Sequence, residues 1–213
     1  MSYGYIGDTS TSIKQQVKNA GVLSMSDVLD LEGKGHLGGS LELIEEQTVS
    51  GVATVDFTSI KENVYNVHLL QLSNYQHTDT SSGFAGIRFY ESGVLETGSV
   101  YQIAYQRGDS SGAFGILQST TNAQLVQFRN FGGADSNHSG NGYSYFYNLG
   151  NSSKYSFQTT HSSYLDNSSN AEFTMGGGVL PQASTVNGIR IFAGAGNLSA
   201  TIKLYGLKQI WVT

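Results

Sequence analysis

The chain has 213 residues, of which 13% are charged, with a formal net charge of −5 and no cysteine. Its lysines and arginines are scattered, so it lacks the basic footprint with which proteins bind nucleic acid. The absence of cysteine excludes disulfides and thiolate metal sites. No apolar run approaches the roughly 18 residues of a membrane span. We therefore expect neither nucleic acid nor a membrane as partner.

The uncharged part of the composition favours β-structure. Glycine is abundant at 27 residues, proline occurs once, and there are 13 tyrosines and 10 phenylalanines. Aromatic residues are enriched in strands, and this aromatic content is too high for a disordered chain. The composition suits sheets with Ser, Thr and Tyr on their outer faces better than an enzyme with a charged cleft.

Residues 1–45 differ from the rest of the chain, and we expect them to form an extended N-terminal arm. Ile13 and Val17 have helical spacing. Ser24 and Asp27 form a capping box at the start of a second short helix. A segment this small holds no core of its own and gains its order from a partner. The arm is therefore predicted to attach the protein to a larger assembly.

From about Leu41 the apolar period changes to two, which is typical of half-buried strands. Clusters of Gly, Asn, Ser and Asp separate the runs, as turns require. The runs cover residues 52–57, 64–72, 86–90, 100–105, 124–131, 143–147, 155–159, 171–175, 188–192, 199–205 and 209–213. Their spacing is too short for parallel crossovers. Residues 46–213 are therefore predicted to form one all-β sandwich or barrel.

The alternation within these runs also predicts which side chains form the core. One face of each strand should be apolar and turned inward. The predicted core residues are Val55, Phe57, Leu70, Ile87, Phe89, Phe128, Phe146, Phe157, Phe173, Ile189, Ile202 and Leu204.

Three stretches of the chain together resemble virion structural proteins of tailed bacteriophages, especially small marine ones. They are residues 21–24 with 38–44, then 55–60 with 65–70 and 86–89, then 188–192 with 196–206. The second and third stretches are similar to the opening and closing strands of a jelly-roll module found in tail fibres and capsid-associated proteins. The resemblance implies a β-sandwich of jelly-roll type. It brings no catalytic residues and no cofactor.

The search for catalytic or metal-binding chemistry gives little. The five histidines show none of the spacings of a zinc site. His68 lies in a predicted strand, where a hydrogen-bonded sheet histidine is the expected role. The carboxylates form no local signature, although the spacing of a glycosidase pair is not visible in a sequence. We therefore expect no catalytic residue, no metal and no enzymatic activity.

Tyr143, Tyr145 and Tyr147 are the candidate ligand or subunit contacts. Aromatic rings stack on sugars and fill interfaces because they supply large contact area at little cost in entropy. In the favoured interpretation Phe146 points to the core and the tyrosines face a neighbouring subunit. In the alternative they bind a host-surface glycan together with loops at residues 135–141 and 166–170, which are expected to be exposed tips.

These observations predict a structural protein on the exterior of a virion, assembled in the host cytoplasm and held to other virion proteins by its arm. The chain is short and has no heptads and no shaft repeat, which favours a capsid decoration, cement or head-fibre protein. The alternative is a tail fibre or tail-attached receptor-binding protein. Low surface charge and many tyrosines predict a broad contact between copies, and we expect a homotrimer.

Overall fold

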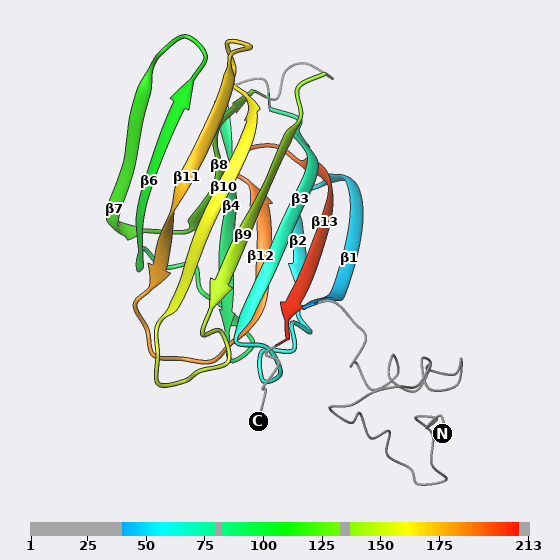
Figure 1. Cartoon of the computed structure of the whole chain (residues 1–213), viewed down its shortest axis with the longest axis vertical. Coiled ribbons are helices and arrows are strands. Elements are labelled where there is room, and N and C mark those ends of the chain that lie inside the picture. Colours follow the sequence, from blue (N-terminus) through cyan, green and yellow to red (C-terminus); the bar gives the residue numbers. More distant parts are fainter. Residues whose placement is uncertain (1–39, 80–81, 133–136, 209–213) are drawn as a thin grey trace, which may run out of the picture. The chain divides into compact units, whose positions relative to one another are not determined.

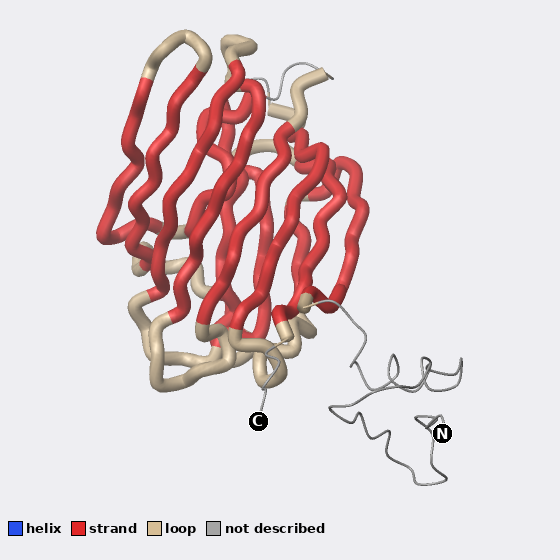
Figure 2. Tube along the Cα trace, in the orientation of Figure 1, coloured by secondary structure: helices blue, strands red, loops and turns tan. Residues whose placement is uncertain are grey.

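The computed structural model describes residues 40–79, 82–132 and 137–208. Within these residues all regular elements are β-strands, thirteen in number, and none is a helix (Figure 2). The strands form two antiparallel sheets in a sandwich-like arrangement (Figure 1). The all-β prediction is therefore confirmed. The two helices expected before residue 34 and the strand expected at 209–213 lie outside the described residues.

The larger sheet has eight strands in the order β1-β13-β3-β9-β10-β11-β6-β7. Their bounds are β1 Leu41–Val52, β13 Leu198–Leu207, β3 Val67–His77, β9 Gly140–Tyr147, β10 Ser156–Leu165, β11 Ala171–Leu180, β6 Tyr101–Asp109 and β7 Phe114–Asn122. β1 and β7 are the two edges of this sheet. β1 begins at Leu41, where the apolar period of the sequence changes to two.

The smaller sheet has five strands, with the order β2-β12-β4-β5 and with β8 also paired to β4. Their bounds are β2 Thr54–Phe57, β12 Val186–Ala193, β4 Ser82–Glu91, β5 Val94–Leu95 and β8 Leu125–Gly132. β5 pairs with Tyr90 and Glu91 of β4, whereas β8 pairs with the opposite half of that strand. In Figure 1 this sheet lies behind the larger one.

The core lies between the two sheets. Ten of the predicted core residues are buried there: Val55, Phe57, Leu70, Ile87, Phe89, Phe128, Phe146, Ile189, Ile202 and Leu204. Edge-to-face ring contacts join the layers, such as that of Phe89 with Phe146 at 5.5 Å between centroids. Fully burying one such ring contributes roughly 1.5–3 kcal/mol, so these contacts help to hold the two sheets together.

A row of buried polar side chains covers one edge of β8. Tyr105 Oη accepts the N–H of Val126 at 3.0 Å, and Ser162 Oγ donates to the carbonyl of Gln127 at 2.8 Å. Tyr164 Oη contacts both the N–H and the carbonyl of Arg129. Backbone groups that are buried need partners, and here side chains of the larger sheet supply them in place of another strand.

This polar row explains the two predicted core residues that are wrong. Phe157 is 44% exposed and Phe173 is half-buried on the outer side of the larger sheet. The inward positions of their strands are polar instead, with Gln158 on β10 and Thr174 on β11 both buried. Because these side chains serve the β8 edge and its surroundings, the inward face is not the more apolar one.

Candidate binding face

The outer side of the larger sheet carries no charged side chain across six neighbouring strands. Opposed residues of antiparallel strands share a face, and the registers join Leu69, Tyr145, Thr159, Gly177, Ala104 and Gln118 in one row from β3 to β7. We call the outward residues of these strands the uncharged face. They are Val67, Leu69, Gln71 and Ser73 on β3; Asn141, Tyr143, Tyr145 and Tyr147 on β9; Phe157, Thr159, His161 and Ser163 on β10; Ala171, Phe173, Met175, Gly177 and Val179 on β11; Gln102, Ala104, Gln106 and Gly108 on β6; and Phe114, Ile116, Gln118 and Thr120 on β7.

The smaller sheet presents a different outer surface. Arg190 forms a bidentate pair with Asp56, with both N–O distances 2.7 Å, and its guanidinium lies over the ring of Tyr90. The hydrogen bonds from Arg190 hold the pKa of Asp56 below its usual value. Arg88 lies 4.7 Å from the ring centroid of Phe192. The two faces of the sandwich therefore differ in charge, and the uncharged face is the one suited to a neutral partner.

The three candidate tyrosines lie on β9, the second of the six strands that form the uncharged face. Tyr143 is 44% exposed, and Tyr145 and Tyr147 are half-buried. Tyr143 makes an edge contact with Tyr145, and Tyr147 Oη lies 3.3 Å from Thr159 Oγ1. Phe146 points the other way and is fully buried. The structure thus brings the tyrosines together on the outside and places Phe146 in the core.

A hollow of about 420 Å³ lies beside Tyr143 on this face. Its lining combines aromatic rings with neutral polar groups: Leu69, Gln71, Leu72, Ser73, Asn141, Gly142, Tyr143, Tyr145, His161 and Ser163. A bulge in β3 shapes one wall, because Asn74 has a φ of 53° and donates its N–H to Asn141 Oδ1 at 3.0 Å. We call this site the Tyr143 hollow. Its chemistry fits a neutral polar ligand.

A second depression of about 480 Å³ lies nearer β7 on the same sheet. Its lining includes Phe157, Gly177, Gly178, Gln102 and Thr120. Added Cβ atoms at Gly177 and Gly178 would meet the carbonyls of Gln158 and Gln102 at 2.4 and 2.8 Å. These glycines therefore allow the close approach of the backbones of β10, β11 and β6.

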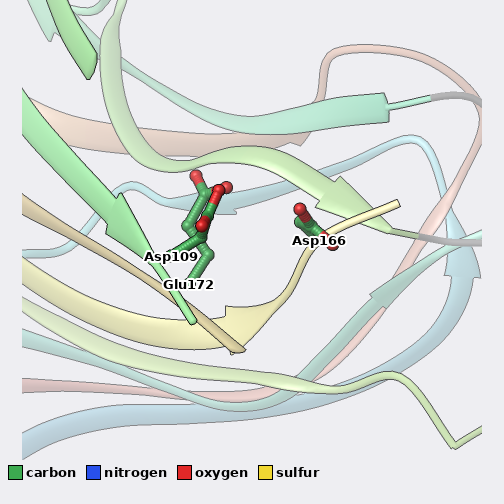
Figure 3. A group of neighbouring side chains, drawn as sticks. All are labelled: Asp109, Asp166 and Glu172. Carbon is green, nitrogen blue, oxygen red and sulfur yellow. The ribbon is translucent and has the colours of Figure 1, made fainter. Parts of the chain in front are cut away.

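Asp109, Asp166 and Glu172 come together at the ends of β6, β10 and β11, with one oxygen of each within 4.8 Å of the others (Figure 3). The chain itself engages all three carboxylates. Glu172 accepts from Arg107 at 2.8 Å and from Tyr164 at 2.7 Å, and burial raises its pKa. Asp109 and Asp166 accept backbone N–H groups of their own turns. These contacts give each carboxylate a structural role: Glu172 links β11 to β6 and β10, and Asp109 and Asp166 stabilise their own turns.

Sequence reasoning missed this cluster because Asp109 lies far along the chain from Asp166 and Glu172, and only the pairing of β6 with β11 brings it to them. It also expected residues 166–170 to be an exposed tip. Asp166 is only 7% exposed, since its carboxylate folds back onto the N–H groups of Ser168 and Asn170. Asn167, Ser168 and Ser169 are exposed, so the tip prediction is confirmed for these residues, and Asp166 is the buried start of the loop.

Two of the histidines, His68 and His161, have different surroundings. His68 is buried in β3 with Nε2 2.8 Å from the carbonyl of Ile60, and burial lowers its pKa. The expected hydrogen-bonded sheet histidine is confirmed. His161 lines the Tyr143 hollow, with its ring centroid 5.9 Å from that of Tyr143. His161 was not singled out from the sequence, because its role depends on the register between β9 and β10.

The fold and this face define an all-β sandwich with a broad uncharged surface on its larger sheet. A comparison of the chain with protein-family models, with curated proteins and with solved structures found no match. Among the residues that the structure describes, no helix is long and apolar enough to cross a bilayer.

Proposed function

We propose that this protein is a non-enzymatic structural protein on the exterior of a phage particle, where copies contact one another through the uncharged face. The single observation that carries the contact is the absence of any charged side chain on that face from β3 to β7. The cores of protein interfaces are depleted of charge and enriched in Tyr, Phe and Met, and this face has all three. We further propose three-fold symmetry for the assembly, since homo-oligomers usually have closed symmetry and three-fold arrangements are frequent in the phage fibres and head decorations that the sequence resembles.

We infer that the sandwich is a modified jelly roll. A jelly roll has eight strands, lettered B to I, in sheets of order B-I-D-G and C-H-E-F. The order β2-β12-β4-β8 corresponds to the first sheet, and β11-β6-β7 corresponds to H-E-F of the second. The hairpin β9-β10 then lies between β3 and β11 as an insertion. This order supports the resemblance to jelly-roll modules of virions, and it makes the candidate tyrosines part of the insertion.

The position on the particle is proposed to be the head, as a decoration, cement or head-fibre protein. Residues 1–45 are proposed to attach the sandwich to other virion proteins. Quantitative mass spectrometry of purified particles tests the position, because copies in the hundreds fit decoration, whereas roughly a dozen or two fit a tail appendage. Deletion of residues 1–40 tests the arm. Unchanged incorporation of the shortened chain into particles would remove that part of the proposal.

The contact between copies is tested by placing a charge in the middle of the uncharged face. Thr159 is exposed at the centre of the row that joins Tyr145 to Gly177, so Thr159→Glu should remove the three-fold contact and reduce the size of the assembly in sedimentation experiments. Ser50→Glu is the matched control, because Ser50 is exposed on β1, outside the face. A wild-type protein that sediments as a monomer at micromolar concentration would refute the contact.

A second function, binding of a neutral glycan by a tail-attached protein, is favoured by the Tyr143 hollow. Asn141, Gln71 and Ser163 surround aromatic rings there, and sugars need both stacking surfaces and neutral hydrogen-bonding groups. A glycan array tests it with the wild type, Tyr143→Ala and Tyr155→Ala. Tyr155 is similarly exposed but lies outside the hollow. Binding that only Tyr143→Ala abolishes would favour this function.

A further inference from the structure

The edge strand β7 differs from the other sheet edges in the part of the chain that the structure describes. The opposite edge of the larger sheet, β1, carries Glu42, Glu45 and Glu46. In the smaller sheet β2 and β5 have only four and two residues, and the buried polar row covers β8. Charge, shortness and cover are the usual ways in which proteins block an edge. β7 has nine residues, and none is charged or proline.

The alternation of hydrogen bonds shows which backbone groups of β7 are free. Asp109 donates its N–H to the carbonyl of Ala113 at 3.0 Å, which makes this a hydrogen-bonded pair of the β6–β7 ladder. Hydrogen-bonded and non-bonded pairs alternate in an antiparallel ladder. The N–H and carbonyl groups of Phe114, Ile116 and Gln118 therefore point away from β6. The Arg129 guanidinium donates to the Ile116 carbonyl at 3.1 Å. This contact is consistent with a carbonyl that points away from β6.

The side chains on this edge are apolar and exposed. Phe114 is 70% exposed and Ile116 is 68% exposed, among the highest values for large apolar residues in the described chain. Both point out from the uncharged face, and Phe114 contacts Phe173 of β11. An uncharged strand with exposed apolar side chains and free backbone groups is a template for pairing with another strand.

We propose that β7 pairs in antiparallel fashion with β7 of a second copy, with Ile116 opposite Ile116 on a two-fold axis. This register places Phe114 opposite Gln118 on both sides of the axis. Every free N–H and carbonyl of Phe114, Ile116 and Gln118 then has a partner. The Ile116 carbonyl has two lone pairs, so the Arg129 contact leaves one for the second strand. The register shift of the β6–β7 ladder between Tyr101 and Ile103 ends the regular edge beyond Ser119.

A second copy is the occupant because the strand is complementary to itself. Two-fold contacts place the same patch on both sides, and a charged strand would oppose like charges there. β7 itself carries no charged residue, and Arg129 of β8 is a charged group that reaches this edge, at the Ile116 carbonyl. The inference does not depend on the position proposed on the particle. Together with a three-fold contact through the face, it would give a closed hexamer of D3 symmetry.

Cross-linking tests the register directly, because the wild-type chain has no cysteine. Ile116→Cys should give a covalent dimer with a short bismaleimide, since opposed residues of a hydrogen-bonded pair lie only about 5.5 Å apart between Cα atoms. Gln118→Cys is the matched control on the same strand and face. In the proposed register its counterpart lies four residues further along, so it should stay uncoupled. Equal cross-linking of the two variants would overturn the proposal.

Sedimentation gives an independent readout. The wild type should sediment as an even-numbered assembly, and Ile116→Lys should lose the two-fold contact because two ammonium groups would meet at the axis. Thr48→Lys introduces the same charge on the exposed outer side of β1 and should leave the assembly unchanged. An Ile116→Lys protein with the wild-type assembly would refute the pairing. Wild-type trimers, together with an Ile116→Cys variant that does not cross-link, would refute the β7 contact while leaving the proposed function intact.

Discussion

The hydroxyl of Tyr105 on β6 lies 2.7 Å from Oε1 of Gln158 on β10, in the interior between the two sheets. The same hydroxyl accepts the N–H of Val126 on β8. Gln158 in turn donates from Nε2 to Ser144 Oγ at 2.8 Å. Three strands of the larger sheet thus reach one strand of the smaller sheet through polar atoms. Burial raises the pKa of Tyr105, which keeps the hydroxyl protonated and able to donate.

The first prediction is that Tyr105→Phe destabilises the fold by roughly 1–3 kcal/mol, because the Val126 N–H and the Gln158 side-chain oxygen would each lose a buried partner. Chemical denaturation measures this change in the free energy of unfolding. Tyr155→Phe is the control, since Tyr155 is 48% exposed and should change stability little. Equal stability of the two variants would show that the Tyr105 hydroxyl is not required at the β8 edge.

The second prediction concerns Glu91, which lies beside Glu96 at the β4–β5 turn. Ser184 donates to the Glu91 carboxylate, and Gln182 lies against both carboxylates. Burial, with the nearby charge of Glu96, raises the pKa of Glu91 above its ordinary value of 4.5. The folded state therefore binds the carboxyl proton of Glu91 more tightly than the unfolded state does. The resulting stabilisation is complete below pH 4.5 and is lost as the pH rises through the folded pKa.

The variant Glu91→Gln keeps the neutral shape at every pH. Relative to this variant, the wild type should lose stability over the range from pH 4.5 upward, measured as the difference in the free energy of unfolding. Glu96→Gln should reduce that loss, because it removes the like charge. A difference between wild type and Glu91→Gln that stays constant over this range would contradict the prediction.

The third prediction uses two glycines with positive φ. Gly176 in β11 has a φ of 150°, and an added Cβ would lie 2.3 Å from the carbonyl oxygen of Ala104. Gly93 has a φ of 86° with nothing within 4 Å of an added Cβ. Both substitutions to Ala strain the backbone, but only Gly176→Ala also creates a clash. It should cost about 1–3 kcal/mol more than Gly93→Ala in denaturation experiments. Equal costs would mean that β11 moves freely away from β6.

Much of the fold could be predicted from alternation alone. Val55 with Phe57 and Ile202 with Leu204 have apolar side chains at every second position, and all four are buried. Alternation does not predict the core where a long-range contact places a polar side chain inward and an apolar one outward. In β10 the buried position is taken by Gln158 and the exposed one by Phe157, because the partner of Gln158 is a strand 32 residues away.

The same limit applies to strands without an alternating pattern. β7 was not predicted, since Phe114 and Ile116 are exposed and its remaining residues are mostly small or polar. Pairing with β6 makes it a strand, and pairing is a long-range property. Of the candidate site, the sequence predicted only that Tyr143, Tyr145 and Tyr147 lie on one side of the same strand, β9. The participation of Leu69, Gln71 and His161 required the registers with β3 and β10.

The fourth prediction contrasts the two sides of β9. Phe146 is fully buried and meets the ring of Phe89, whereas Tyr143 is 44% exposed on the uncharged face. Phe146→Ala should cost roughly 3–5 kcal/mol, because the lost burial is joined by a cavity. Tyr143→Ala should change the free energy of unfolding by less than about 1 kcal/mol, yet it should weaken self-association or ligand binding.

Thermal unfolding and sedimentation of the two variants separate these effects. The expected pattern is a large fall in melting temperature for Phe146→Ala, and an unchanged melting temperature with weaker association for Tyr143→Ala. Phe146→Leu controls for general disturbance of β9, since it keeps most of the apolar volume and should retain most of the stability. If Tyr143→Ala unfolds as easily as Phe146→Ala, the tyrosine supports the fold itself. The outer side of β9 would then no longer be a surface reserved for a partner.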